Sequence, residues 1–225
     1  MPNKRMIKEH EWIIMPCYNE ARNISEVIRD VKEYCNNIVI IDDGSSDDTF
    51  EIASKLKVFV LKHVINLGKG AALKTGADFA VMNGARKLVF IDSDGQHEPK
   101  EIPKFFNLLD EYDVVFGSRK LNKNMPGVFR IGNFLLSTYT YLLFGVKLSD
   151  TQSGYRALTA QSYKKIRWKA KDYSVEGEMI AHVGKRKLKY KEIEINTIYK
   201  NKYKGTTVLD GIKIGLKMLL IKIQR

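Results

Sequence analysis

Short apolar runs alternate with amphipathic stretches along the first 120 residues of the chain. The runs predict buried strands at 12–15, 38–41, 58–61, 88–91 and 114–116. Apolar positions at helical spacing predict helices at 23–34, 47–56, 68–83 and 99–110. We expect Asn23 to cap the first helix and Pro16 to end the first strand. Near-continuous apolar strands alternating with helices indicate an α/β fold, with a mostly parallel central sheet and flanking helices.

The pattern changes after residue 118. A polar loop at 121–127 precedes an apolar, aromatic helix at 129–144, and a second polar loop covers 150–156. Residues 189–195 alternate like a half-exposed strand. Without internal repeats or a low-complexity linker, residues 1–225 are expected to form a single domain ending in an amphipathic helix at 206–225. That helix fits two interpretations, ordinary packing on the domain or an in-plane membrane anchor drawn to anionic headgroups.

The chain is strongly basic, with 38 Lys and Arg against 26 Asp and Glu in 225 residues, which indicates an anionic partner. Two cysteines are too few for a disulfide scaffold or a cysteine-built zinc site. We see neither a secretory signal nor the ~18 continuous apolar residues of a membrane span. We therefore expect a cytoplasmic protein, peripheral at the cytoplasmic face of a membrane. No nucleic-acid-binding module is recognisable, which makes nucleic-acid binding the weakest alternative.

The most informative segment is Asp92-Ser93-Asp94-Gly95-Gln96, which follows the fourth apolar run. Alternate residues of an extended chain share one face, so Asp92, Asp94 and Gln96 could converge. Three oxygen donors at the carboxyl end of a buried strand suit a divalent cation that keeps positions open for phosphate oxygens. The alternative is an ordinary Asp-Ser-Asp-Gly surface turn.

Other polar residues fall at the same predicted edge of the sheet, where α/β folds bind ligands. Asp43 could accept hydrogen bonds from a nucleotide base, or could simply shape a tight turn. Lys69 opens a helix after Gly68, so it could bind an anion or reflect close packing. Arginine suits phosphate, and Arg119, Arg130 and Arg156 all lie near loop ends.

Seven motifs in this order resemble family 2 glycosyltransferases of the GT-A fold, in particular the dolichol-phosphate mannose synthase branch. The resemblance spans about Trp12 to Arg156. It rests on Pro16-Cys17-Tyr18-Asn19-Glu20, Asp42-Asp43-Gly44-Ser45, Asn66-Leu67-Gly68-Lys69-Gly70, Asp92-Ser93-Asp94-Gly95-Gln96-His97, Gly117-Ser118-Arg119, Arg130 and Asp150-Thr151-Gln152-Ser153-Gly154-Tyr155-Arg156.

The resemblance implies a metal-dependent inverting transferase that moves a hexose from a nucleotide sugar, such as GDP-mannose or UDP-glucose, to a polyprenyl (dolichyl) phosphate. Its implied nucleoside contacts are Pro16, Tyr18, Glu20 and Asp43. Lys69 and Ser93 would belong to the same donor site.

Further roles concern the phosphates. Asp92 would contact the ribose or sugar, and Asp94 and Gln96 would bind Mg²⁺ or Mn²⁺ on the diphosphate. Arg119 would hold the donor phosphate and Arg130 the acceptor phosphate.

One position departs from the family. Val208 stands where a phosphate-binding lysine is usual, so Lys202 or Lys204 would have to substitute. The alternative within the family is an acceptor hydroxyl, which needs a carboxylate base, and Asp150 is the candidate. The sequence leaves the oligomeric state open.

Overall fold

The computed structural model describes residues 9–119, 127–198 and 208–223. In the helices at 127–144 and 208–223 the side chains are described from Gly132 and Gly215 onward.

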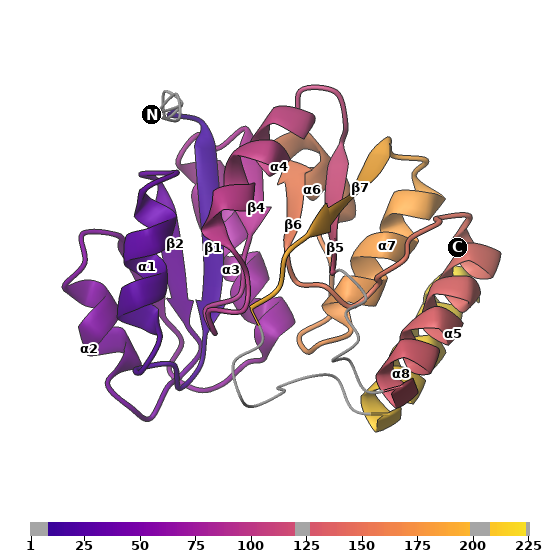
Figure 1. The fold of residues 1–225 in the computed structure, drawn as a ribbon, viewed down its shortest axis with the longest axis horizontal. Coiled ribbons are helices and arrows are strands. Elements are labelled where there is room, and N and C mark those ends of the chain that lie inside the picture. The colour runs from indigo at the N-terminus through magenta and orange to yellow at the C-terminus, as the bar shows by residue number, and fades with distance from the viewer. Residues whose placement is uncertain (1–8, 120–126, 199–207, 224–225) are drawn as a thin grey trace.

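A seven-stranded sheet forms the centre of the described structure, with strand order β3-β2-β1-β4-β6-β5-β7 (Figure 1). All pairings are parallel except those of β6, which runs antiparallel to β4 and β5. The predicted mostly parallel sheet is thus confirmed. The strands are β1 Glu11–Cys17, β2 Ile38–Asp42, β3 Phe59–Lys62, β4 Lys87–Phe90, β5 Val114–Arg119, β6 Arg156–Thr159 and β7 Tyr190–Ile195.

Helices cover both faces of the sheet and enclose a hydrophobic core on each. Alternate residues of β1 enter the two cores, Ile13 and Met15 one, Trp12 and Ile14 the other. The first core lies under α1 Ile24–Lys32, α2 Thr49–Ser54 and α4 Ile102–Leu108, which follows the 3₁₀ turn Pro99–Glu101. The second lies under α3 Lys69–Met82, α6 Ala160–Ile166 and α7 Val175–Lys185, with α5 Gly127–Phe144 and α8 Val208–Ile223 beside them (Figure 1).

Two local expectations near the first strand are wrong. β1 continues through Pro16 to Cys17, because its pairing with β4 stops at Ile14 and that side no longer needs a donor at Pro16. The Asn23 side chain makes no cap hydrogen bond to its helix. It donates to Glu20 Oε2 at 2.9 Å, and the Glu20 carbonyl accepts from the N–H of Ile24.

Strand β6 lies where the sequence predicts only the end of a polar loop. Four residues are too few for a periodic signal, and the strand begins with the charged Arg156. The Arg156 guanidinium is buried 5.2 Å from the centre of the Phe116 ring, so the tertiary fold accommodates a residue that looks like a surface charge in sequence.

The carboxyl ends of β1, β2 and β4 are tied together at one edge of the sheet. The N–H of Asp43 donates to the Cys17 carbonyl at 2.9 Å. The Ser93 hydroxyl donates to the Pro16 carbonyl, also at 2.9 Å. These bonds bring the loops after the three strands side by side, which is the edge where the sequence places its polar motifs.

Candidate active site

Asp92 and Lys69 form the centre of this edge. The Lys69 ammonium lies 2.8 Å from Asp92 Oδ1 and 3.1 Å from Glu176 Oε1. Burial opposes the charge of Lys69, but the two carboxylates outweigh it and raise the pKa of Lys69. Burial also disfavours ionised Asp92, yet Lys69 and His97 hold the pKa of Asp92 well below its usual range. The Lys69 ammonium therefore pairs with carboxylates, and its predicted part in donor binding stays a prediction.

Gly154 packs against this ion pair so closely that a Cβ atom there would overlap Asp92 Oδ2 and Lys69 Nζ. Replacing Gly154 with alanine should displace the two side-chain ends while leaving the backbone in place. We expect about a tenfold weaker apparent affinity for donor, because small misplacements in a site are costly. Steady-state kinetics with a thermal melt checks this, and an unchanged donor KM would contradict it.

Asp94 is the side chain best suited to bind a cation here. The chain turns at Ser93–Gly95, so the expected extended run from Asp92 to Gln96 is wrong. Within this turn, Asp94 Oδ1 accepts the Gln96 N–H at 3.0 Å. Burial and the charge of Asp92 raise the pKa of Asp94, with a further contribution from Glu20. This is the repulsion that a bound cation would relieve. Carboxylate and amide oxygens fit Mg²⁺ or Mn²⁺.

Across residues 9–119, 127–198 and 208–223, no group of three or more His, Cys, Asp or Glu side chains could enclose a metal ion. Mg²⁺ often binds through one or two carboxylates and completes its coordination with substrate phosphates and water. Asp94 and Gln96 are the residues that would hold such an ion.

The residues predicted to bind the nucleoside differ in their surroundings. Tyr18 is 48% exposed, whereas Glu20 and Asp43 are buried. Asp43 accepts from the N–H groups of Leu67 and Gly68 at 3.0 and 2.8 Å and lies 2.7 Å from His63 Nδ1. Asp43 therefore shapes the loop that leads into α3, and its contact with a base stays a prediction.

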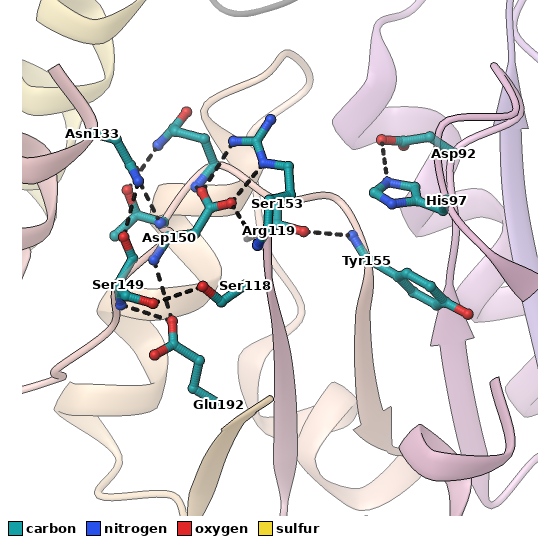
Figure 2. A network of polar contacts seen from close by, with 12 residues as sticks. Asp92, His97, Ser118, Arg119, Asn133, Ser149, Asp150, Ser153, Tyr155 and Glu192 are labelled. Atoms are coloured by element: carbon teal, nitrogen blue, oxygen red, sulfur yellow. Dashed lines mark hydrogen bonds and ion pairs between the residues drawn. The ribbon is translucent and has the colours of Figure 1, made fainter. Parts of the chain in front are cut away.

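A second polar cluster is built around Arg119 at the end of β5 (Figure 2). Its Nε and Nη2 donate to the two oxygens of Asp150 at 2.6 and 3.1 Å. Burial opposes the charge of Asp150, but Arg119 and backbone donors lower the pKa of Asp150. Glu192 in turn accepts from the N–H of Asp150 at 3.2 Å. A carboxylate with a lowered pKa and a bidentate partner is a poor general base, which argues against that role for Asp150.

The third arginine does not face a ligand. Arg156 donates to the carbonyls of Thr151, Ser153 and Glu176 at 2.7–2.8 Å, so it holds the polar loop in place and the phosphate interpretation is wrong for it. Arg130 belongs to α5, and its side chain lies outside the described part of the structure. The same holds for the Val208 side chain, and Lys202 and Lys204 lie outside the described residues.

Sequence reasoning missed Glu176 and underrated His97. Glu176 lies in the first turn of α7, in a region for which we predicted no element. The sequence feature that could have pointed to Glu176 is its position two residues before Glu178, at the start of an apolar stretch. His97, which lacks a metal-like spacing in sequence, has its Nε2 3.5 Å from Asp92 Oδ2 (Figure 2).

Comparison with known proteins agrees with this geometry. The model of the family "Glycosyl transferase family 2" matches residues 12–167. That match covers more than half of the chain, which therefore belongs to this family, and the protein is a glycosyltransferase.

Two relatives and one solved structure are informative. The chain is 35% identical to a UDP-N-acetylglucosamine–dolichyl-phosphate N-acetylglucosaminyltransferase of Methanococcus voltae, over 94% of this chain and 96% of the relative. It is 32% identical to the polyprenol monophosphomannose synthase of Mycolicibacterium smegmatis, over 71% and 65%. It superposes on glucosyl-3-phosphoglycerate synthase of Mycobacterium tuberculosis, crystallised with Mg²⁺ and UDP, with a TM-score of 0.75, 20% identity and coverage of 95% and 79%. The fold is GT-A.

Membrane spans were sought among the described helices. None of them is long and apolar enough to cross a bilayer.

Proposed function

We propose that this glycosyltransferase is metal-dependent and moves a sugar from a nucleotide sugar to a polyprenyl phosphate at a membrane surface. The observation that carries the proposal is the Lys69–Asp92 ion pair at the carboxyl edge of the sheet, with Asp94 two residues further along the same loop. The relatives named for dolichyl-phosphate and polyprenol transfer support the lipid acceptor.

The residues suggest how transfer would proceed. Cleavage of the sugar–diphosphate bond leaves negative charge on the diphosphate, and a Mg²⁺ or Mn²⁺ held by Asp94 and Gln96 would supply Lewis-acid stabilisation. Arg119, oriented by Asp150, would hold a donor phosphate. The acceptor phosphate is already anionic near neutral pH, so it needs no strong base. In-line attack of this phosphate on the anomeric carbon of the sugar would invert the configuration at that carbon.

The identity of the donor is open to a direct test. The names of the two relatives suggest UDP-N-acetylglucosamine and a mannose donor, beside the predicted GDP-mannose and UDP-glucose. A thermal-shift screen of these nucleotide sugars, with and without Mn²⁺, should give one donor whose stabilisation needs the metal. A screen in which no nucleotide sugar raises the melting temperature would contradict the proposal.

The acceptor would be reached from a membrane surface through an apolar face shared by α5 and α8, which lie side by side (Figure 1). Each helix exposes apolar side chains at helical spacing, and α8 carries lysines between its apolar positions. The face comprises Phe134, Leu135, Tyr141 and Leu142 of α5 and Leu216, Leu219, Leu220 and Ile223 of α8. Lys217 pairs with Asp172, which leaves Lys222 as the cation beside this face. Such an apolar face with a lysine nearby is typical of a surface that inserts among anionic lipids. The amphipathic anchor stays a prediction.

Leu142 and Leu220, 74% and 58% exposed, provide a clean test of this face. Deleting α8 would also remove Met218, which is buried in the core, so substitution is the sharper experiment. We expect Leu142→Asn with Leu220→Asn to weaken binding to anionic liposomes by about tenfold or more, because each leucine loses its apolar burial.

The matched control is Met82→Asn, an 86% exposed apolar residue at the end of α3, which should bind liposomes normally. Flotation and nucleotide binding are measured on the same samples. Equal losses in the double variant and in Met82→Asn, or a parallel loss of nucleotide binding in the double variant, would overturn the membrane assignment.

A further inference from the structure

Glu176 is a buried carboxylate with no function assigned by the sequence motifs. It is 4% exposed, and its Oε1 lies 3.1 Å from the Lys69 ammonium. Its Oε2 is buried and has no hydrogen-bond partner in the described structure. A buried charge is costly unless its surroundings compensate for it, so the link to Lys69 is what keeps this carboxylate in place.

Both ends of the Lys69–Glu176 link are anchored in the backbone. On the α7 side, Arg156 Nη1 donates to the Glu176 carbonyl at 2.8 Å. On the α3 side, Trp168 Nε1 donates to the Gly70 carbonyl at 2.8 Å, and the Ala71 N–H donates to the Lys171 carbonyl at 3.1 Å. The start of α3 and the segment leading into α7 are therefore held together, and the distance between the two side chains is fixed by the fold.

Two acidic and two basic side chains meet at this point. The Lys69 ammonium serves both carboxylates, and the buried guanidinium of Arg156 adds a second positive charge that interacts with Asp92 and Glu176. Without Glu176, the Lys69 ammonium would be held by Asp92 alone. With Glu176, the ammonium is held from two sides, which fixes the orientation of the Asp92 carboxylate beside Asp94.

We propose that Glu176 is a positioning residue, which holds the Lys69 ammonium between two carboxylates and thereby orients Asp92 toward the metal and diphosphate of the donor. The inference rests on the proposed function of the same site. Glu176 acts through Lys69 and does not itself touch the donor.

A ligand-free measurement tests the first half of this statement. A lysine ammonium held by two carboxylates should give a slowly exchanging resonance in a ¹H–¹⁵N correlation spectrum, assigned by its loss in Lys69→Met. We expect Glu176→Gln to shift or broaden that resonance. An unchanged Lys69 signal in Glu176→Gln would overturn the positioning role.

Binding of Mn²⁺ with UDP, and separately with GDP, measured by calorimetry, tests the second half. We expect Glu176→Gln to weaken metal–nucleotide binding about tenfold, as losses of groups that orient metal ligands do. In a Lys69→Met background the same substitution should change it less than about twofold. Equal losses in both backgrounds would overturn the proposal, because Glu176 would then act independently of Lys69.

Glu178 offers a matched control two residues along α7. It accepts from the N–H groups of Lys169 and Ala170 at 2.8 and 2.7 Å. We expect Glu178→Gln to lower the melting temperature but to leave the Lys69 resonance and metal–nucleotide binding unchanged. A Lys69 signal altered equally by both variants would overturn the proposal. Absence of metal–nucleotide binding in the wild type would instead contradict the proposed function, so the two failures are distinguishable.

Discussion

Replacing Asp94 with asparagine is expected to reduce metal-dependent sugar transfer by at least about a hundredfold, because the charge that stabilises the leaving diphosphate is no longer held in place. The fold should tolerate the change. Asparagine can still accept the Gln96 N–H at the position of Oδ1. The raised pKa of Asp94 means that its ionised form is disfavoured in the folded protein, so removing the charge relieves repulsion from Asp92.

The expected signature is therefore loss of activity with an equal or higher melting temperature. Initial rates of transfer and thermal melts of the same preparation check both parts. Asp30→Asn, an exposed carboxylate of α1, is the control for the substitution and should change neither quantity. An Asp94→Asn enzyme that retains full metal-dependent activity would place the cation elsewhere.

Replacing Asp150 with alanine should have the opposite signature, with loss of both stability and activity. The side chain is buried and accepts a bidentate pair of hydrogen bonds from Arg119. Breaking a buried pair by removing one partner costs about 3 kcal/mol of unfolding free energy. Arg119 also loses the group that orients it, so we expect at least about a tenfold fall in kcat/KM.

The chain contains a second bidentate aspartate–arginine pair that serves as a control. Arg167 donates to both oxygens of Asp78 at 3.1 and 2.8 Å, but the Arg167 side chain is 54% exposed. Arg167→Ala leaves the Tyr163–Asp78 hydrogen bond in place, so it should cost much less stability than Asp150→Ala and leave activity intact. Urea denaturation of both variants measures the difference, and equal losses of stability would contradict a special role for the buried pair.

The stability that the Asp150–Arg119 pair contributes should depend on pH in a definite direction. Because folding lowers the pKa of Asp150, its stabilising contribution is present above the ordinary value of 3.8 and is lost as the pH falls through the folded pKa. The stability difference between the wild type and Asp150→Ala should therefore shrink below about pH 4. A difference that grew on acidification would contradict the ionised pair.

The sheet was largely predictable because β1, β2, β4 and β5 are mostly buried and read as continuous apolar runs. The run at 58–61 does form a strand, but β3 is exposed or half-buried at the edge of the sheet, so its expected burial is wrong. The runs at 38–41 and 88–91 match β2 and β4 within one residue. Strand β6 was missed for the opposite reason. It has four residues and begins with Arg156, whose burial depends on Phe116 and on three carbonyls contributed by other segments. These tertiary contacts allow the charged Arg156 side chain to be buried, and they leave no pattern in the local sequence.

In the candidate site, too, some features could be predicted from the sequence and others depend on tertiary contacts. The polar residues after β1, β2 and β4 could be placed at one edge, because parallel strands end together. The partners of these residues could not. Lys69, Asp92 and Glu176 are far apart in sequence, and only the tertiary packing brings both carboxylates within 3.1 Å of the Lys69 ammonium. In sequence Asp150 is a candidate base, and its pairing with Arg119, which argues against that role, arises only in the fold.

Transfer of radiolabelled sugar to a polyprenyl phosphate in anionic vesicles tests the central claim most directly. The donors are GDP-mannose, UDP-glucose and UDP-N-acetylglucosamine, each with Mn²⁺ or with EDTA. We predict that the wild type with Mn²⁺ forms a glycosylated lipid phosphate from one of these donors. No product should form when EDTA replaces Mn²⁺, or when the Asp94→Asn variant replaces the wild type. Transfer of equal rate in EDTA, or transfer only to a hydroxyl acceptor, would contradict the account.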